Sequence, residues 1–223
     1  MREARTDTEK IIDKALYLSL LDMVADVKGN IIGDRIKCMK LAFLVEYPMF
    51  EKRIKGFNCV FFRYDRGPIS KNIYSIWFDL EKAGYIRIRN KNSIELTEEG
   101  HELAHEFIHD VLDTDANRFF FDAMKEVSHK YGCLDSISSV VYDMEVFAIE
   151  LNKRMKIKNV PKGITFTLAL DDADARNAIS VSRSWLETLA IALDPSNKLS
   201  VDKGLDDLRN NRVIPHKKVW ATV

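Results

Sequence analysis

The stretch that decides the fold is SKNIYSIWFDLEKAGYIRIRNKNSIELTEEG, which spans residues 70–100. Ser70 is a suitable N-cap for a helix, and Gly84 supplies the left-handed residue that commonly follows the end of one. Apolar and polar residues then alternate on both sides of an Asn-rich turn at residues 90–93, which predicts a β-hairpin. Thr97 caps a further helix. The stretch therefore predicts a helix, a hairpin and a second helix in close succession.

Three more elements are expected on the N-terminal side of this stretch. Apolar residues recur at helical spacing over residues 7–27, and Gly29 ends that helix. A second helix is expected to begin at Asp34, a plausible N-cap, and to close at Pro48. Residues 57–64 (FNCVFFRY) are rich in aromatic and β-branched side chains, so they predict a strand.

The chain beyond residue 114 is expected to be largely helical. The expected elements are helices over residues 116–131 and 135–156, a short strand over 164–170, a long helix from 171 or 172 to 193 and a last helix over 200–212. The expected fold class is therefore mainly α with a small β-hairpin. It is expected in two parts, a first unit over residues 7–114 and a helical C-terminal region over residues 115–223 that packs on it.

The composition is that of an ordinary globular protein without net charge. Apolar residues make up 46% of the 223 residues, and 34 Lys and Arg balance 34 Asp and Glu. Because proteins that bind polyanions usually carry a basic excess, this balance disfavours that class. Residues 35–91 nevertheless hold thirteen Lys and Arg against five acidic residues, and residues 92–115 hold eight acidic residues and no Lys or Arg. We interpret the acidic run as a solvated helix face.

Cysteine usage and the apolar segments indicate a cytoplasmic protein. Cys38, Cys59 and Cys133 are odd in number and scattered, so they predict neither a disulfide framework nor a Cys-type zinc site. The first residues contain no apolar segment of the secretory type. The most apolar stretch, residues 15–27, is interrupted by a serine and two aspartates. We therefore expect a reducing compartment, no signal peptide and no membrane partner.

The succession of helix, hairpin and capped helix resembles the winged-helix fold, with residues 70–82 as the recognition helix and residues 86–96 as the wing. Three motifs carry a narrower resemblance: KLAFL at residues 40–44, FRYDRGPIS at residues 62–70 and an exit from Leu80 through Gly84 to Ile86. Together they resemble the Panacea/SocA-type domain and its YwgA-like relatives, over about residues 7–145.

Members of that family are known mainly as antitoxins of toxin–antitoxin pairs and as phage-associated proteins, and one is similar to an adaptor that delivers its toxin for degradation. The resemblance implies a non-enzymatic, cytoplasmic regulator that binds a protein partner such as a toxin. The family usually has a Thr-His pair after a Tyr-Gly-x-Leu segment. Here residues 131–134 (YGCL) are followed by residues 142–144 (YDM), so the resemblance implies no function for such a histidine.

The helix over residues 70–82 has two faces at 100° per residue. The face expected in the core contains Ile73, Ile76, Trp77, Leu80 and Ala83. The opposite face, which we predict to bind a partner, contains Lys71, Tyr74, Phe78 and Lys82. Aromatic side chains dominate the energetics of protein interfaces, so two aromatics one turn apart with flanking lysines favour a protein partner. The alternative is that the C-terminal helices cover Tyr74 and Phe78.

A DNA-binding transcriptional regulator is the second interpretation. If the hairpin isoleucines point inward, Arg87, Arg89 and Lys91 point outward and can contact phosphates, although exposed hairpins also carry charge for solubility. The expected recognition helix offers few of the Arg, Asn and Gln side chains that read base edges. About twenty residues separate it from the preceding helix, whereas a helix-turn-helix uses about three or four. Binding to duplex DNA is therefore expected to be weak.

A zinc-dependent hydrolase is the third interpretation. The segment HELAHEFIH contains H-E-x-x-H twice and places His101, His105 and His109 on one helix face. In zinc peptidases two such histidines bind metal and the glutamate activates water. Because acidic residues crowd the motif here, we interpret these histidines as a solvated helix face. The sequence contains no phosphate-binding loop or nucleophile elbow, so we expect neither catalytic residues nor a cofactor. A homodimer remains an open alternative.

Overall fold

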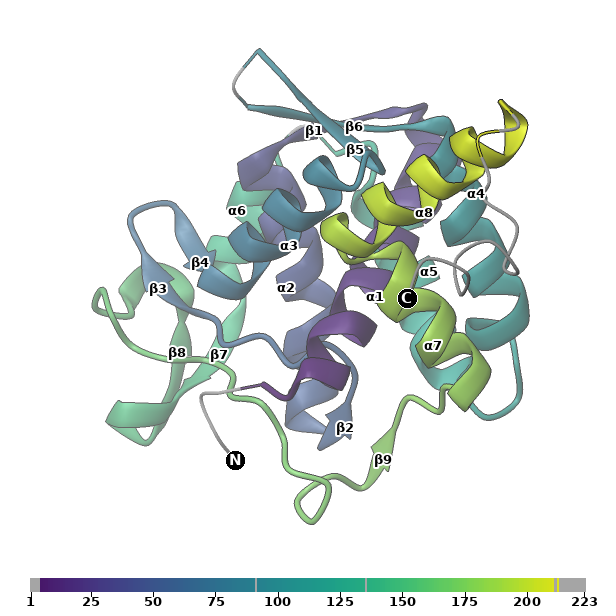
Figure 1. Ribbon diagram of the computed structural model, residues 1–223. Coiled ribbons are helices and arrows are strands. Elements are labelled where there is room, and N and C mark those ends of the chain that lie inside the picture. The colour runs from purple at the N-terminus through teal and green to yellow at the C-terminus, as the bar shows by residue number, and fades with distance from the viewer. Residues whose placement is uncertain (1–4, 91, 135, 211, 213–223) are drawn as a thin grey trace.

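The computed structural model is mainly helical, and its elements are arranged around one central helix, α1 (Figure 1). It describes residues 5–90, 92–134, 136–210 and 212. The helices are α1 (Asp7–Lys28), α2 (Arg35–Glu51), α3 (Lys71–Lys82), α4 (Glu98–Phe107), α5 (Arg118–Tyr131), α6 (Ile137–Asp143), α7 (Arg183–Ala192) and α8 (Pro195–Arg209). The strands are β1 (Ile31–Asp34), β2 (Ile54–Lys55), β3 (Phe62–Tyr64), β4 (Gly67–Ile69), β5 (Ile86–Arg89), β6 (Ser93–Leu96), β7 (Glu145–Ala148), β8 (Lys153–Lys156) and β9 (Asn177–Ala178). A π-helical turn over Ile108–Leu112 continues α4.

The helix α1 has a specific cap at each end and is buried between them. Thr6 Oγ1 accepts a hydrogen bond from the backbone N–H of Glu9 at 3.2 Å, and Glu9 Oε2 accepts one from the backbone N–H of Thr6 at 2.7 Å. Gly29 ends the helix at φ +92°, as expected. Residues 15–24 are all buried, because α2, α3, α4, α5 and α7 pack against this helix. The hydrophobic core is therefore built on α1.

The expected starts of three other helices are confirmed. Asp34, Ser70 and Thr97 are the N-caps of α2, α3 and α4, and each side chain accepts a hydrogen bond from a backbone N–H in the first turn. Pro48 does not close α2, which continues beyond it. The proline removes one intrahelical hydrogen bond, but its own carbonyl still accepts one from the N–H of Lys52 at 3.2 Å. The last turn of α2 is thus retained.

The expected hairpin is present, but the β-structure is more extensive than one hairpin. β5 pairs with β6, and β1 pairs with the other edge of β6 to give a three-stranded antiparallel sheet. The sequence pattern does not predict β1, because the strand is short and Ile32 alone in it is buried. Two antiparallel hairpins, β3–β4 and β7–β8, and one parallel pair, β2–β9, complete the described strands. The predicted mainly helical class is therefore confirmed, whereas the prediction of a single hairpin is wrong.

Of the strand expected over residues 57–64, only β3 is paired in a sheet. The aromatic pattern before β3 reflects burial of an extended segment between helices. Side chains, rather than a neighbouring strand, accept hydrogen bonds from three of its backbone N–H groups. The backbone N–H groups of Asn58, Val60 and Phe61 donate to the side chains of Asp13, Asn72 and Thr167, at 2.9, 3.0 and 3.0 Å.

The prediction of one helix over residues 135–156 is wrong for most of that range. α6 ends at Asp143, and β7 and β8 form a hairpin whose turn contains Asn152 at φ +50°. Buried and less buried residues alternate along β7, which is the period of a strand. The strand expected over residues 164–170 is reduced to one bridge between Thr165 and Phe62.

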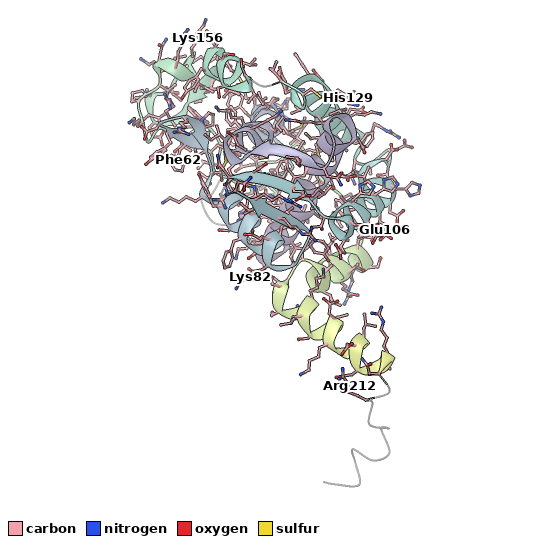
Figure 2. The ribbon with its side chains drawn as sticks, turned by 90° about the horizontal axis from the view of Figure 1, so that it is seen from above. Phe62, Lys82, Glu106, His129, Lys156 and Arg212 are labelled. Carbon is pink, nitrogen blue, oxygen red and sulfur yellow. The ribbon has the colours of Figure 1, made fainter. Side chains whose placement is uncertain are left out.

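The two C-terminal helices begin at different residues from those expected. α7 starts after Ser182, its N-cap, whereas Asp172 forms an ion pair with Lys55 at 2.5 Å. α8 starts after Asp194, because Pro195 suits the first turn of a helix. Figure 2 shows α8 extending away from the other elements toward Arg212. Residues 213–223 of the expected C-terminal region lie outside the described residues.

We expect Tyr17→Phe to lower the free energy of unfolding by about 1–3 kcal/mol. Trp77 Nε1 of α3 donates to the hydroxyl of Tyr17 of α1 at 2.6 Å, and both side chains are buried. The substitution leaves the indole N–H buried without an acceptor. Urea denaturation measures the loss, and Tyr64→Phe, which removes the hydroxyl of an exposed tyrosine, is the control with an expected change below about 0.5 kcal/mol. Equal midpoints for the two variants would contradict the prediction.

Candidate functional site

α3 exposes the aromatic residues that were predicted to bind a partner. Its buried residues are Ile73, Ile76, Trp77 and Leu80, as the helical periodicity predicts. Tyr74 is 47% exposed and Phe78 is 58% exposed. The described C-terminal helices therefore do not cover these two rings, and that alternative is wrong. Ser75 and Glu81 are exposed on α3 as well, and we call the four residues predicted to bind a partner, Lys71, Tyr74, Phe78 and Lys82, the α3 surface.

The two rings of the α3 surface have neighbours on their own helix. The Tyr74 ring meets Trp77 edge-to-face, with 5.0 Å between the ring centroids. Lys82 Nζ lies 4.7 Å from the centroid of the Phe78 ring. Contacts of this kind restrict the rotamers of an exposed ring and so reduce the entropy that it loses on binding. The α3 surface is thus partly preorganised.

A pocket of about 330 Å³ adjoins the α3 surface at Tyr74, and we call it the Tyr74 pocket. Its lining comes from the first turns of α2, the β3–β4 hairpin, α3 and the β5–β6 turn. The polar and aromatic lining residues are Arg35, Tyr64, Asp65, Arg66, Tyr74 and Asn92. Sequence reasoning predicts one of these, Tyr74. The basic excess of residues 35–91 is the one signal that points toward the others.

The β3–β4 hairpin forms one wall of the Tyr74 pocket and is held from behind by α6. The Tyr142 hydroxyl donates to the backbone carbonyl of Asp65 at 2.9 Å. Lys40 Nζ and Arg63 Cζ lie 5.6 and 5.3 Å from the centroid of the Tyr142 ring. Both cations are buried, and they belong to the KLAFL and FRYDRGPIS segments. These segments therefore position the hairpin that lines the pocket.

The β5–β6 hairpin presents less free positive charge than its sequence suggests. Arg87 is exposed, but it lies opposite Glu95 in the strand register. Arg89 forms an ion pair with the same carboxylate. Lys91, the third candidate for phosphate contacts, lies outside the described residues. One glutamate thus faces both described arginines, which reduces their attraction for phosphate groups.

Carboxylates contact two of the three histidines that form the repeated H-E-x-x-H pattern. His101 Nδ1 lies 2.5 Å from Asp22 Oδ1 of α1, and His109 Nδ1 lies 2.7 Å from Asp110 Oδ1. The His105 ring lies 5.8 Å from that of His101, between centroids. Among the described residues, no group of three or more His, Cys, Asp or Glu side chains is placed to hold a metal ion. The contact of His101 with Asp22 instead joins α4 to α1.

Comparison with known proteins identifies no relative of this chain. No protein-family model, no curated protein and no solved structure matches its sequence or fold. A search of the described residues also finds no helix with the length and apolar character needed to cross a membrane.

The contact between Asp22 and His101 makes the packing of α4 on α1 dependent on pH. Burial raises the pKa of Asp22, and the hydrogen bond with Asp22 raises the pKa of His101. The ordinary pKa of histidine is about 6.5. Because the pKa of His101 is higher in the folded state, its protonation stabilises the fold below about pH 6.5, and this stabilisation is lost as the pH rises through the raised pKa.

We expect His101→Ala to lower the free energy of unfolding by about 0.5–1 kcal/mol more at pH 5.5 than at pH 8.5. The difference is small because the imidazole is 53% exposed and its charge is screened by solvent. Urea denaturation at the two pH values measures it. Leu199→Ala, which changes an exposed side chain of α8 that does not ionise, is the control and should show equal losses at both pH values. A loss of stability for His101→Ala that is equal at both pH values, or larger at pH 8.5, would show that protonated His101 does not stabilise the fold through Asp22.

Proposed function

We propose that this chain is a non-enzymatic, cytoplasmic regulator of the antitoxin type, which acts by binding a protein partner through the α3 surface. The observation that supports this most is the exposure of Tyr74 and Phe78, one turn apart, on a helix whose other face is buried. Neighbouring exposed aromatic rings are typical of protein interfaces, where a few such residues supply most of the binding free energy.

The surroundings of these rings also suit a protein partner. Lys71 and Lys82 lie on the same face of α3, and the Tyr74 pocket adds Arg35 and Arg66. Tyrosine and arginine are among the residues most enriched at the energetic centres of interfaces. Because this region is basic, we expect the partner to be acidic where it meets α3.

The antitoxin type rests on the resemblance carried by the KLAFL and FRYDRGPIS segments. Their positions agree with a role in supporting the α3 surface, since Ser70 caps α3 and Arg63 of the neighbouring β3–β4 hairpin packs on the Tyr142 ring of α6. A winged-helix-like arrangement of residues 7–114 belongs to the same proposal. It is supported by α3 leading directly into the β5–β6 hairpin, with β1 as the third strand.

The geometry favours the two other interpretations less. For a transcriptional regulator, Glu95 contacts Arg89 and lies opposite Arg87, where a phosphate would have to approach. For a zinc-dependent hydrolase, His101 is bonded to a buried aspartate, and the described residues offer no third ligand group beside the histidines. The α3 surface has neither of these conflicts.

Co-expression of the chain with the products of its neighbouring genes tests the proposed function. We expect one such product to inhibit growth when it is expressed alone, and the chain to relieve the inhibition by forming a complex with it. The absence of any toxic or binding neighbour would contradict the antitoxin type. A binding neighbour without toxicity would retain a protein-binding regulator and remove only the antitoxin assignment.

Tyr74→Ala and Phe78→Ala are each expected to weaken partner binding by about 2 kcal/mol, which is about thirtyfold in the dissociation constant. Because both rings are exposed, each substitution should lower the free energy of unfolding by less than about 1 kcal/mol. Calorimetric titration and thermal melts measure the two effects. Leu199→Ala, at a residue 71% exposed on α8, is the matched control and should bind normally. Normal binding by both aromatic variants would show that the partner does not use the α3 surface.

A further inference from the structure

The Tyr74 pocket contains two guanidinium groups that have no carboxylate partner. Arg66 is exposed at the turn of the β3–β4 hairpin, and Arg35 is partly buried at the first position of α2. Arg35 Cζ lies 5.7 Å from the centroid of the Trp77 ring, and its Nε is buried without a hydrogen-bond partner. Within the described ranges, neither arginine forms an ion pair. Because no described carboxylate neutralises either guanidinium group, the pocket favours an anionic ligand.

The acidic residue that lines the pocket, Asp65, and the one that precedes Arg35 in the chain, Asp34, contact other groups. Asp65 lines the pocket, but its carboxylate forms an ion pair with Lys162. The Asp34 carboxylate accepts the backbone N–H of Lys37 at 2.7 Å, which caps α2. Neither carboxylate forms an ion pair with Arg35 or Arg66, so among the described residues both guanidinium groups lack an anionic partner.

Two further cations lie behind the wall of the pocket and contact neutral groups. Lys40 is 1% exposed and donates to the Ser138 hydroxyl, and Arg63 is 9% exposed and donates from Nε to the carbonyl of Ile157 at 3.1 Å. Neither has a carboxylate within ion-pair distance among the described residues. Because charge is poorly screened in a protein interior, both add to the positive potential around the hairpin.

The remaining lining suits an apolar side chain next to the anionic group. Tyr64 and Tyr74 are half exposed, and Met39, Pro68 and Ile69 supply an apolar surface between the elements. Arginines paired with exposed tyrosines are typical of the centres of protein interfaces. The volume of about 330 Å³ is at the small end of the range for ligand pockets, which suits a short segment of chain.

We propose that the Tyr74 pocket binds an acidic segment of a protein partner, with an Asp or Glu carboxylate directed to Arg35 and Arg66 and an adjacent apolar side chain packed against Tyr64 and Tyr74. This inference rests on the proposed function, because it identifies what the partner of the α3 surface presents. Guanidinium groups bind carboxylates with two parallel hydrogen bonds, and both Arg35 and Arg66 line the pocket.

A nucleic acid fits the same region less well. Binding a single strand requires a continuous basic groove along the backbone together with stacking rings. On the side of the β5–β6 hairpin the basic region is interrupted, since Glu95 forms an ion pair with Arg89. The described cations of this region without a carboxylate partner therefore lie at the pocket and on the α3 surface and do not continue along the hairpin, which suits recognition of one or two carboxylates.

Nuclear magnetic resonance titration of the full chain with two capped tetrapeptides tests this inference. The probes are Ac-Gly-Phe-Asp-Gly-NH2 and Ac-Gly-Phe-Asn-Gly-NH2, which differ only in the carboxylate. We expect the Asp peptide to shift the backbone resonances of Tyr64 and Asn92 and to bind at least about tenfold more tightly than the Asn peptide. Equal binding of the two peptides, or shifts confined to other surfaces, would overturn the inference.

Variants of the two arginines make the test specific to the pocket. Arg66→Gln and Arg35→Gln are each expected to weaken binding of the Asp peptide at least about fivefold, and Arg66→Gln remains informative if Arg35→Gln disturbs α2. Arg87→Gln removes an exposed arginine outside the pocket and should bind the peptide normally. A ten-residue thymidine oligonucleotide that binds the pocket more tightly than the Asp peptide would overturn the inference in favour of a nucleic-acid site.

The outcomes distinguish this inference from the proposed function. If a protein partner binds through Tyr74 and Phe78 but is unaffected by Arg35→Gln and Arg66→Gln, the function stands and the carboxylate inference fails. If the Asp peptide binds the pocket in an Arg66-dependent way and no protein partner is found, the carboxylate specificity stands and the proposed function fails.

Discussion

The polar side chains of α1 constrain the rest of the structure, because a helix buried on every side must satisfy them inside the protein. Asp13, Tyr17 and Asp22 occur about one turn apart along this helix. They contact, in turn, Asn58 before β3, Trp77 of α3 and His101 of α4, at 2.9, 2.6 and 2.5 Å. An unsatisfied buried polar group costs about 1–3 kcal/mol, so each of these side chains specifies which element lies against it. Burial raises the pKa of Asp13 to about 6, although its contacts with Arg5 and Asn58 lower it.

The contact between Tyr17 and Trp77 also determines which face of α3 is exposed. With the Trp77 indole directed at α1, the helical period places Tyr74 and Phe78 outward. Arg35 lies over the same indole from the start of α2, and its backbone N–H donates to the carbonyl of Asn92 at 2.9 Å. The orientation of one tryptophan thus connects the core, the α3 surface and the Tyr74 pocket. The proposed interface is a direct consequence of how the core is packed.

The sequence predicts the N-terminal half better than the C-terminal half, because its signals there are local. Caps at Ser70 and Thr97 and a left-handed Gly84 specify α3, the hairpin and α4 without knowledge of the rest of the chain. Residues 135–156 lack such signals, and a short helix followed by a hairpin has an apolar pattern that also fits one long helix. Residues 57–61 are misread for another reason. Their backbone donors are satisfied by side chains from distant segments, which no local pattern reports.

The sequence by itself determined the mainly helical class, the faces of α3 and the candidate aromatic residues Tyr74 and Phe78, since these follow from the 3.6-residue period and from capping. Only the tertiary structure decided that those two rings are exposed, that Glu95 pairs with Arg89, and that His101 is bonded to Asp22. The Tyr74 pocket, too, is formed only by the tertiary structure. Its lining comes from α2, the β3–β4 hairpin, α3 and the β5–β6 turn, which lie far apart along the chain. They meet because satisfying the buried polar groups of α1 allows few arrangements of the surrounding elements.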